Sequence, residues 1–341
     1  MRASPGDVVH RLAAVQAQDY AGAKWAVGMR LSGAGDVDVE QAYDDGAILR
    51  THMLRPTWHF CAPEDIRWLL MLTAPRVHAI NAGQYRRHGL VPAIMRKAHR
   101  AIARALEGGI ALTRDELRGV LARARIDTGF DQRMAYILMA AELDGLICSG
   151  PRRGRQFTYA LLEERMPPEP MLTRDEALVE LAGRFFHTRG PATPHDFAKW
   201  SGLTLADARM ALDVVGATLE HESIGGRTLW FPAIRPPRHT GHEAHLLSIY
   251  DEFVSGYRDR RDIGDPAHAT LLTGMGNALQ FLIVLDGRVR GTWKRSITSR
   301  SVEIALAPFV RLRTGEGRAV RQAAERYGAF LGLSVRLTGL A

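Results

Sequence analysis

The sequence holds 341 residues, of which 46% are hydrophobic, so it is too long for one compact core and apolar enough for two to four modules. It contains 45 Lys and Arg against 37 Asp and Glu, which gives a formal net charge of +8 and a pI near 9.8. Most of the excess is arginine, which suits bidentate contacts with phosphate. An Arg- and Ala-rich composition also accompanies a GC-rich genome, so charge alone leaves a polyanionic partner and a compositional bias open.

The two cysteines and the hydropathy pattern exclude several protein classes. Cys61 and Cys148 lie far apart and outside any CxxC spacing, which indicates neither a disulfide framework nor a structural zinc site. No apolar run reaches the roughly 18 residues that span a bilayer, and the N-terminus lacks the pattern of a secretion signal. We therefore expect a cytoplasmic protein that is neither membrane-embedded nor exported.

The first segment has the signals of a helix start. Ser4 is a good N-cap, Pro5 suits the first helical position, and Asp7 lies in the favourable first turn. Val8, Leu12 and Val15 continue as an apolar stripe. Because the pattern breaks after residue 19, the helix is expected to finish near Gln18, which places the amides of Gln16-Ala17-Gln18 at its C-terminal end.

The remainder of residues 1–90 completes the first expected unit. A helix is expected from Val37 to Asp45, followed by two short β-prone runs, Ile48 to Met53 and Thr57 to Ala62, around Leu54-Arg55-Pro56. Helices followed by a two-stranded wing are typical of a winged-helix unit.

Residues 91–166 repeat this order. Thr113-Arg114-Asp115-Glu116 is a capping box that opens a helix through Ala124, and a longer helix follows from Asp131 to Asp144. Strands from Leu146 to Ser149 and from Gln156 to Leu162 flank a basic turn at residues 150–155. The sequence therefore predicts a second winged helix, which a proline-rich linker at residues 166–170 follows.

Residues 171–235 are predicted to form a third winged helix. Thr193 caps a helix to Trp200, and Thr204 caps the next helix to Val214, with the spacing of a helix-turn-helix. Strands from Thr218 to Ser223 and from Arg227 to Phe231 form its wing across Gly225-Gly226.

Residues 240–341 change in character. A hairpin is expected around Asp286-Gly287, between strands Leu279 to Leu285 and Arg288 to Arg295. A strand from Val302 to Phe309, an amphipathic helix from Gly317 to Leu331 and a strand from Leu333 to Leu337 follow. The predicted fold class is therefore α+β, mainly helical, with three tandem winged-helix units and a small C-terminal α+β module.

Five short motifs occur in order along nearly the whole chain. They are the QxQ at residues 16–18, the run Arg50-Thr51-His52-Met53-Leu54-Arg55-Pro56-Thr57-Trp58-His59, the segment 190–197, the segments 250–252 and 256–260, and the segment 286–293. Together they resemble the AlkZ/YcaQ-type winged-helix DNA glycosylases. The resemblance implies tandem winged helices, excision of bases from alkylated or crosslinked DNA, and Gln16 and Gln18 as the catalytic residues beside the deoxyribose.

The same resemblance implies a β-hairpin that probes the minor groove, and the hairpin around Asp286-Gly287 is our candidate. One departure concerns the N-terminus. Members of that family usually have a further helix before the one that carries the glutamines, whereas only Met1-Arg2-Ala3 precede Ser4 here.

The chemistry of two amides limits the reaction. Glutamine carries no charge, so it positions water but does not abstract a proton outright. N-alkylation makes a purine cationic and its glycosidic bond labile, and amide dipoles that hold a water and an oxocarbenium-like sugar match that demand.

The placement of the two glutamines sets a further condition. On an ideal helix residues i and i+2 lie about 200° apart, so both reach one site only if the helix ends there. A polar helix end that satisfies backbone groups is the structural alternative. Asp19 is either a base or, in preference, a cap or the partner of a nearby arginine.

Other polar residues are weaker candidates. A probable strand carries Arg55, Thr57 and His59 at alternating positions, so all three would face one side. Arg55 is suited to a phosphate contact. His59 either contacts the substrate or is a structural residue. Asp251 either assists a catalytic water or pairs with an arginine. The further DNA-binding candidates are cations near turns: Arg152, Arg153, Arg155, Arg288, Arg290, Lys294 and Arg295. His239, His242 and His245 have an HxxHxxH spacing, but no carboxylate or cysteine completes a metal set, so no metal is expected.

We therefore predict a monofunctional DNA glycosylase that hydrolyses the N-glycosidic bond of N-alkylated purines, with crosslink unhooking as an extension. It would need no cofactor, and no lysine is placed for lyase chemistry. The expected partner is double-stranded DNA carrying alkylated bases, and the protein is expected to be a monomer. The alternatives are a winged-helix transcriptional regulator that reads DNA with the helix from Thr204 to Val214, and a catalytically silent relative.

Overall fold

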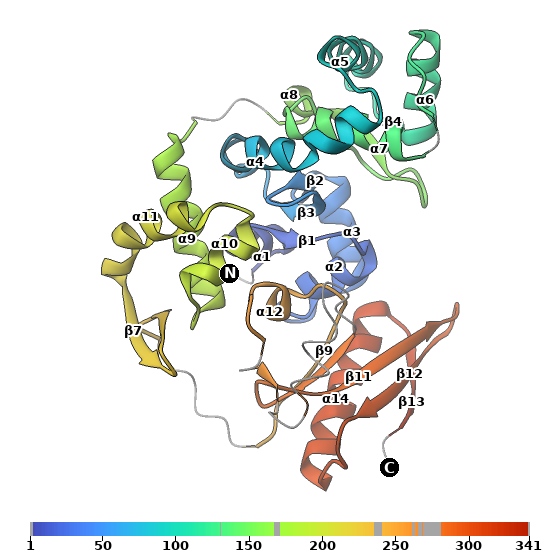
Figure 1. The fold of residues 1–341 in the computed structure, drawn as a ribbon. Coiled ribbons are helices and arrows are strands. Elements are labelled where there is room, and N and C mark those ends of the chain that lie inside the picture. Colours follow the sequence, from blue (N-terminus) through green and yellow to red (C-terminus); the bar gives the residue numbers. More distant parts are fainter. Residues whose placement is uncertain are drawn as a thin grey trace.

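The fold is taken from a computed structural model that describes residues 3–129, 131–166, 171–234, 241–260, 263–264, 268 and 281–339. Helices contribute more residues than strands, and the fold class is α+β (Figure 1). Among these residues, no helix is both long and apolar enough to cross a bilayer.

The N-terminal region surrounds a three-stranded sheet with the order β1-β3-β2. Its elements are α1 (Pro5–Leu12), β1 (Val15–Gln16), α2 (Tyr20–Gly28), α3 (Asp36–Asp44), β2 (Leu49–Met53), β3 (Thr57–Cys61) and α4 (Ile66–Arg87). The capping box of Ser4 and Asp7 opens α1, and Asp19 caps α2, as the sequence indicated. The long helix α4 was not predicted from the sequence.

The predicted end of the first helix is wrong. The helix α1 stops at Leu12 rather than near Gln18, and Ala13 adopts a φ of +62°. Val15 and Gln16 then pair with Phe60 and His59 of β3. Tertiary hydrogen bonds to a strand that lies more than 40 positions away in the sequence therefore override the local helical pattern.

The next two regions contain most of the elements that the sequence predicted. Residues 92–165 form α5 (Pro92–Leu106), β4 (Leu112–Thr113), α6 (Arg114–Arg123), α7 (Asp131–Leu143), β5 (Ile147–Ser149), β6 (Thr158–Leu161) and α8 (Leu162–Arg165). Residues 174–232 form α9 (Arg174–Arg189), α10 (Pro194–Ser201), α11 (Leu205–Val215), a short 3₁₀ helix (Gly216–Thr218), β7 (Leu219–Ile224) and β8 (Arg227–Pro232). Thr193 and Thr204 cap α10 and α11 with full capping boxes.

The C-terminal region is a five-stranded sheet with one long helix on it. Its elements are β9 (Ala244–Leu247), α12 (Glu252–Ser255), β10 (Leu282–Leu285), β11 (Arg288–Ile297), β12 (Ser301–Pro308), α14 (Thr314–Leu331) and β13 (Ser334–Thr338). The order is β13-β12-β11-β10-β9, in which β12 and β13 are parallel. The strand β9 was missed by the sequence analysis, and Leu279 of the expected first strand lies outside the described residues.

Two shared cores join regions that are distant in the sequence. One apolar cluster contains Val9, Trp25 and Phe60 of the N-terminal region together with Trp293 and Tyr327 of the C-terminal region. Another packs β2 and α4 against α9, α10 and α11. Strand β1 lies where these regions meet (Figure 1). Arg55 and Glu252, from segments far apart in the sequence, both contact Gln16 on this strand.

Candidate active site at strand β1

Gln16 is the last residue of strand β1, and Gln18 lies two positions beyond it, at a bend before α2. The backbone N–H of Ala17 donates to the carbonyl oxygen of Trp58 at 2.7 Å, and the N–H of Trp58 faces the Oε1 of Gln18 at 3.4 Å. Both glutamines are thereby held beside strand β3, with Gln16 half-buried and Gln18 exposed.

Arg55 holds the side chain of Gln16. Its Nη2 donates to the Oε1 of Gln16 at 3.1 Å, and its Nη1 donates to the carbonyl oxygen of Trp200. A guanidinium only donates, so the amide oxygen of Gln16 must face Arg55 and its NH₂ group faces away. Burial lowers the pKa of Arg55. The predicted phosphate contact is therefore not what this structure shows, because the guanidinium serves Gln16 and Trp200.

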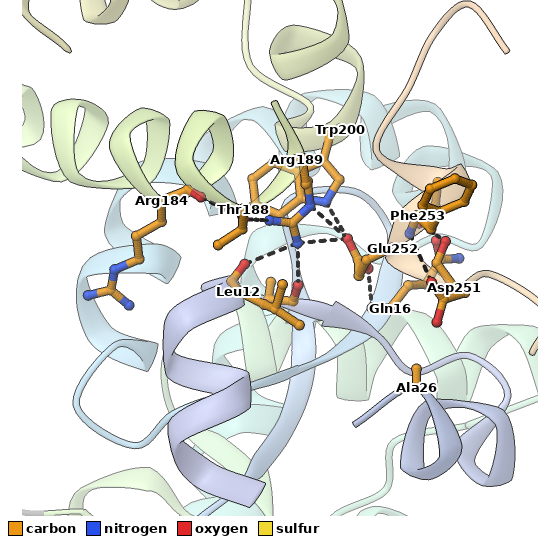
Figure 2. A network of polar contacts seen from close by, with 12 residues as sticks. Leu12, Gln16, Ala26, Arg184, Thr188, Arg189, Trp200, Asp251, Glu252 and Phe253 are labelled. Atoms are coloured by element: carbon orange, nitrogen blue, oxygen red, sulfur yellow. Dashed lines mark hydrogen bonds and ion pairs between the residues drawn. The ribbon is translucent and has the colours of Figure 1, made fainter. Parts of the chain in front are cut away.

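Glu252 anchors the backbone of Gln16 and was missed by the sequence analysis. Its Oε1 accepts from the N–H of Gln16 at 2.9 Å, while its Oε2 accepts from Arg189 Nη2 and from Trp200 Nε1, both at 2.8 Å (Figure 2). Its side chain is buried, and burial raises the pKa of Glu252. The charge of Arg189 and the hydrogen bond from Gln16 outweigh that effect and lower the pKa overall. Glu252 is thus an ionised carboxylate in the protein interior.

Arg189 closes this network. Its Nη2 also donates to the carbonyl oxygens of Leu12 and Ala14, at 3.1 and 3.0 Å, and its guanidinium lies 4.2 Å from the ring centroid of Trp200 (Figure 2). These carbonyls belong to the segment where α1 ends and β1 begins. Arg189 therefore satisfies the carbonyl groups that the early end of the helix leaves free, and no local sequence pattern marks it.

Asp251 forms an ion pair with an arginine, Arg30, which is the structural role that the sequence left open for it. Its carboxylate binds Arg30 through two hydrogen bonds, of 2.9 and 2.8 Å, and its Oδ1 also accepts from the N–H of Phe253. Because both oxygens are engaged and the residue is only 1% exposed, the structure gives no support to Asp251 as an assistant to a catalytic water.

His59 is enclosed rather than open to a cleft. It lies opposite Gln16 on β3 with 0% of its surface exposed, and its Nδ1 lies 2.9 Å from the carbonyl oxygen of Thr57. Burial, followed by the charge of Arg55, lowers the pKa of His59 well below its usual value, so the ring is neutral with Nδ1 protonated. Among the described residues, neither His59 Nε2 nor Thr57 Oγ1 has a hydrogen-bond partner. Of the three residues predicted to face one side, Arg55 and Thr57 are therefore half-buried and His59 is fully buried.

The cations that the sequence predicted to bind DNA lie in different environments in the structure. Arg152 forms an ion pair with Glu40 at 3.0 Å, and Arg153 forms one with Glu116 at 2.7 Å. Arg295 donates to the hydroxyl of Tyr327 beside helix α14. Of the other predicted cations, Arg155, Arg288 and Lys294 are exposed, and Arg290 is half-buried. Two of the three cations in the 150–155 turn therefore already have carboxylate partners.

Two hairpins leave the C-terminal sheet. In the β10–β11 turn, Asp286 accepts from the N–H of Glu243 and lies 2.7 Å from His242 Nδ1. The hairpin of β11 and β12 is longer, and Ile297 near its tip is 50% exposed. Of the three spaced histidines, His239 lies outside the described residues, and His245 belongs to β9. No group of three or more potential metal ligands converges within the part of the chain that the structure describes.

Comparison with known proteins decides the family. The family model described as DNA glycosylase AlkZ-like matches residues 9–330. The chain belongs to the AlkZ-like DNA glycosylase family. A member of this family is a DNA glycosylase and has DNA as its substrate, which confirms the predicted enzyme class. Because the matched family consists of DNA glycosylases, the transcriptional-regulator alternative is not favoured.

A curated protein and a solved structure, both from Streptomyces sahachiroi, are also similar to this chain. The interstrand DNA cross-link repair glycosylase of Streptomyces sahachiroi is 25% identical over 334 residues, which cover 90% of this chain and 85% of that protein. The solved structure of the Streptomyces sahachiroi DNA glycosylase AlkZ superposes with a TM-score of 0.78 at 24% identity and covers 99% of this chain and 94% of that chain. This AlkZ-like glycosylase therefore has the AlkZ fold.

Proposed function

We propose that this AlkZ-like glycosylase excises N-alkylated, cationic purines from duplex DNA by hydrolysing the N-glycosidic bond. The observation that carries the proposal is the pair of neutral amides at the end of β1 and just beyond it, in a region where the buried carboxylates of Asp251 and Glu252 are both engaged in ion pairs. When the C1′–N bond breaks, its electrons leave with the cationic base, which becomes neutral without protonation. Water then adds to C1′ and releases a proton, so a positioning site suffices and a strong base is not required.

We assign different roles to the two glutamines. Among the described residues, one long hydrogen bond reaches the Oε1 of the exposed Gln18, so this oxygen is available to hold the water and to face the oxocarbenium-like sugar. The amide of Gln16 is fixed through Arg55, so its NH₂ group donates toward the bound nucleotide. The backbone of Gln16 is in turn held by Glu252.

We further propose that the enzyme unhooks interstrand crosslinks, as the name of the Streptomyces relative states for that protein. The hairpin of β11 and β12 is better suited to probe the minor groove than the predicted one at Asp286-Gly287. It is longer and carries Ile297 as an exposed apolar side chain that fits between base steps.

The division into domains, the oligomeric state and the cellular location are also part of the proposal. We retain three winged-helix units at residues 1–90, 91–166 and 171–235, a C-terminal module at 240–341, and action as a monomer on alkylated DNA. The order of helices and a hairpin in the second and third regions supports the first point. Cys61 and Cys148 are both free and buried, which supports the cytoplasmic location.

Excision of N7-methylguanine from a duplex oligonucleotide tests the function. The wild type should produce abasic sites, and Gln18→Ala should lower the single-turnover rate by roughly 100-fold, since it removes a polar contact to the developing charge. Gln322→Ala, on the exposed face of α14, is the matched control and should leave the rate unchanged. Absence of abasic sites with the wild type would identify a silent relative, and an unchanged rate in Gln18→Ala would overturn the assignment of the site.

A further inference from the structure

The positive charge of this chain is concentrated in one stretch of sequence. Residues 66–106 contain eight Arg and Lys and no Asp or Glu, which equals the formal net charge of +8 of the whole chain. The stretch covers α4, the turn after it and α5. None of the cations that the sequence predicted to bind DNA, in the 150–155 turn or in the C-terminal hairpin, belongs to it.

Helix α5 arranges half of these cations as a stripe. We define the α5 stripe as Arg96, Lys97, Arg100 and Arg104, all of which are exposed. At 100° per residue they occupy about 100° of the helix circumference and extend over about 12 Å of its axis. The buried residues of α5 are Ala98, Ile102 and Leu106, and they lie on the opposite side of the helix. The helix therefore packs on one face and presents only positive charge on the other.

The α5 stripe also differs from other basic residues in its lack of partners. Within the described ranges of the chain, no carboxylate pairs with the four stripe residues, nor with the exposed Arg86 and Arg87 at the end of α4. By contrast, Arg152 and Arg153 are neutralised by Glu40 and Glu116. Unpaired exposed cations keep their full attraction for a polyanion.

We propose that the α5 stripe binds the phosphate backbone of duplex DNA without regard to sequence, away from the site on β1. Arginine is the residue best suited to phosphate, and each strand of a duplex carries one phosphate per about 3.4 Å of helix axis, so a stripe of about 12 Å has several phosphates within reach. Figure 1 shows α5 at the outer end of the second region, with α4 and α7 between it and β1. The proposal requires DNA binding alone, so it stands apart from the excision chemistry.

Equilibrium binding to undamaged duplex DNA tests this surface. The triple variant R96Q/R100Q/R104Q should weaken the affinity for two unrelated duplexes of about 30 base pairs by at least roughly tenfold at about 0.1 M salt. The slope of log K against log salt should become shallower by about 2 to 3, since each lost phosphate contact contributes about 0.9. The control R311Q/R318Q/R321Q removes the same charge from exposed positions of the C-terminal region and should have a much smaller effect.

A charge-conserving variant and thermal unfolding separate a loss of charge from a loss of folding. R96K/R100K/R104K keeps the charge and should keep most of the affinity, and all variants should unfold at the wild-type temperature. An unchanged salt slope in the Gln variant, or an equal loss in the control, overturns the proposal. So does binding to vesicles of phosphatidylserine and phosphatidylcholine that depends on the stripe while DNA binding does not, because the stripe would then contact a lipid surface. Since no excision is measured, a failure here is distinct from a failure of the proposed reaction.

Discussion

The site on β1 and the α5 stripe use charge in opposite ways. Around β1, Glu252 and Arg189 are buried, paired with one another and hydrogen-bonded to backbone groups. On α5, the cations point to solvent and lack carboxylate partners among the described residues. Ion pairs in the interior fix geometry at a high desolvation cost, whereas exposed cations act on a distant polyanion. The charged residues around Gln16 therefore hold it in place, and our proposal assigns binding of undamaged DNA to the α5 stripe instead.

The largest expected effect comes from breaking the interior pair. Glu252→Gln keeps the shape of the side chain but leaves Arg189 as a buried charge without its counter-ion. The free energy of unfolding should fall by about 3 to 5 kcal/mol, measured by urea denaturation. Excision should also fall at temperatures where the variant is folded, because the backbone of Gln16 loses a charged acceptor.

An exposed carboxylate provides the matched control. Glu303→Gln on β12 should change the free energy of unfolding by less than about 1 kcal/mol. If Glu252→Gln proved equally mild, the buried network would not be what holds β1 in place.

A smaller effect is expected when the orientation of one amide is released. Arg55→Lys replaces a planar fork with a point charge, which does not reach Gln16 and the carbonyl of Trp200 together in the same geometry. The single-turnover rate of N7-methylguanine excision should fall roughly tenfold, which corresponds to about 1.4 kcal/mol. DNA affinity should change little, and Arg11→Lys, at an exposed arginine of α1, should leave both quantities unchanged. A loss of affinity without a loss of rate would return Arg55 to the role of a phosphate contact.

The smallest effect concerns pH. The pKa of His59 is lowered in the folded chain, whereas in the unfolded chain it is about 6.5. Between these two values the unfolded state binds a proton that the folded state does not, so stability is complete above about pH 6.5 and falls as the pH decreases. The slope should not exceed about 1.4 kcal/mol per pH unit for this group. Burial lowers the pKa of His99 and His245 as well, so they share the dependence.

Urea denaturation between about pH 5 and pH 7.5 measures this slope. His59→Asn, whose amide replaces the donor to Thr57, should reduce it. A slope identical to that of the wild type would mean that His59 accepts a proton in the folded protein.

Local signals in the sequence were sufficient for many elements. The caps at Ser4, Thr113, Thr193 and Thr204 all join residues three positions apart, and the structure confirms each of them. The ordered motifs predicted the family, which the match over residues 9–330 confirms. Such features depend on hydrogen bonds within one turn of chain or on short runs of residues, and a sequence displays them directly.

Tertiary structure decided how the candidate site is built. Pairing with β3 ended α1 at Leu12, so Gln16 lies on a strand and Gln18 at the bend after it, rather than both at the end of a helix. The acceptor for the N–H of Gln16 is Glu252, which lies 236 positions away, and the carboxylate that neutralises Arg152 lies 112 positions away. The sequence by itself determined the family, the amides and the excess of positive charge. Only the folded chain decided which charges are cancelled and which remain free, because that depends on contacts between residues that have no relation along the sequence.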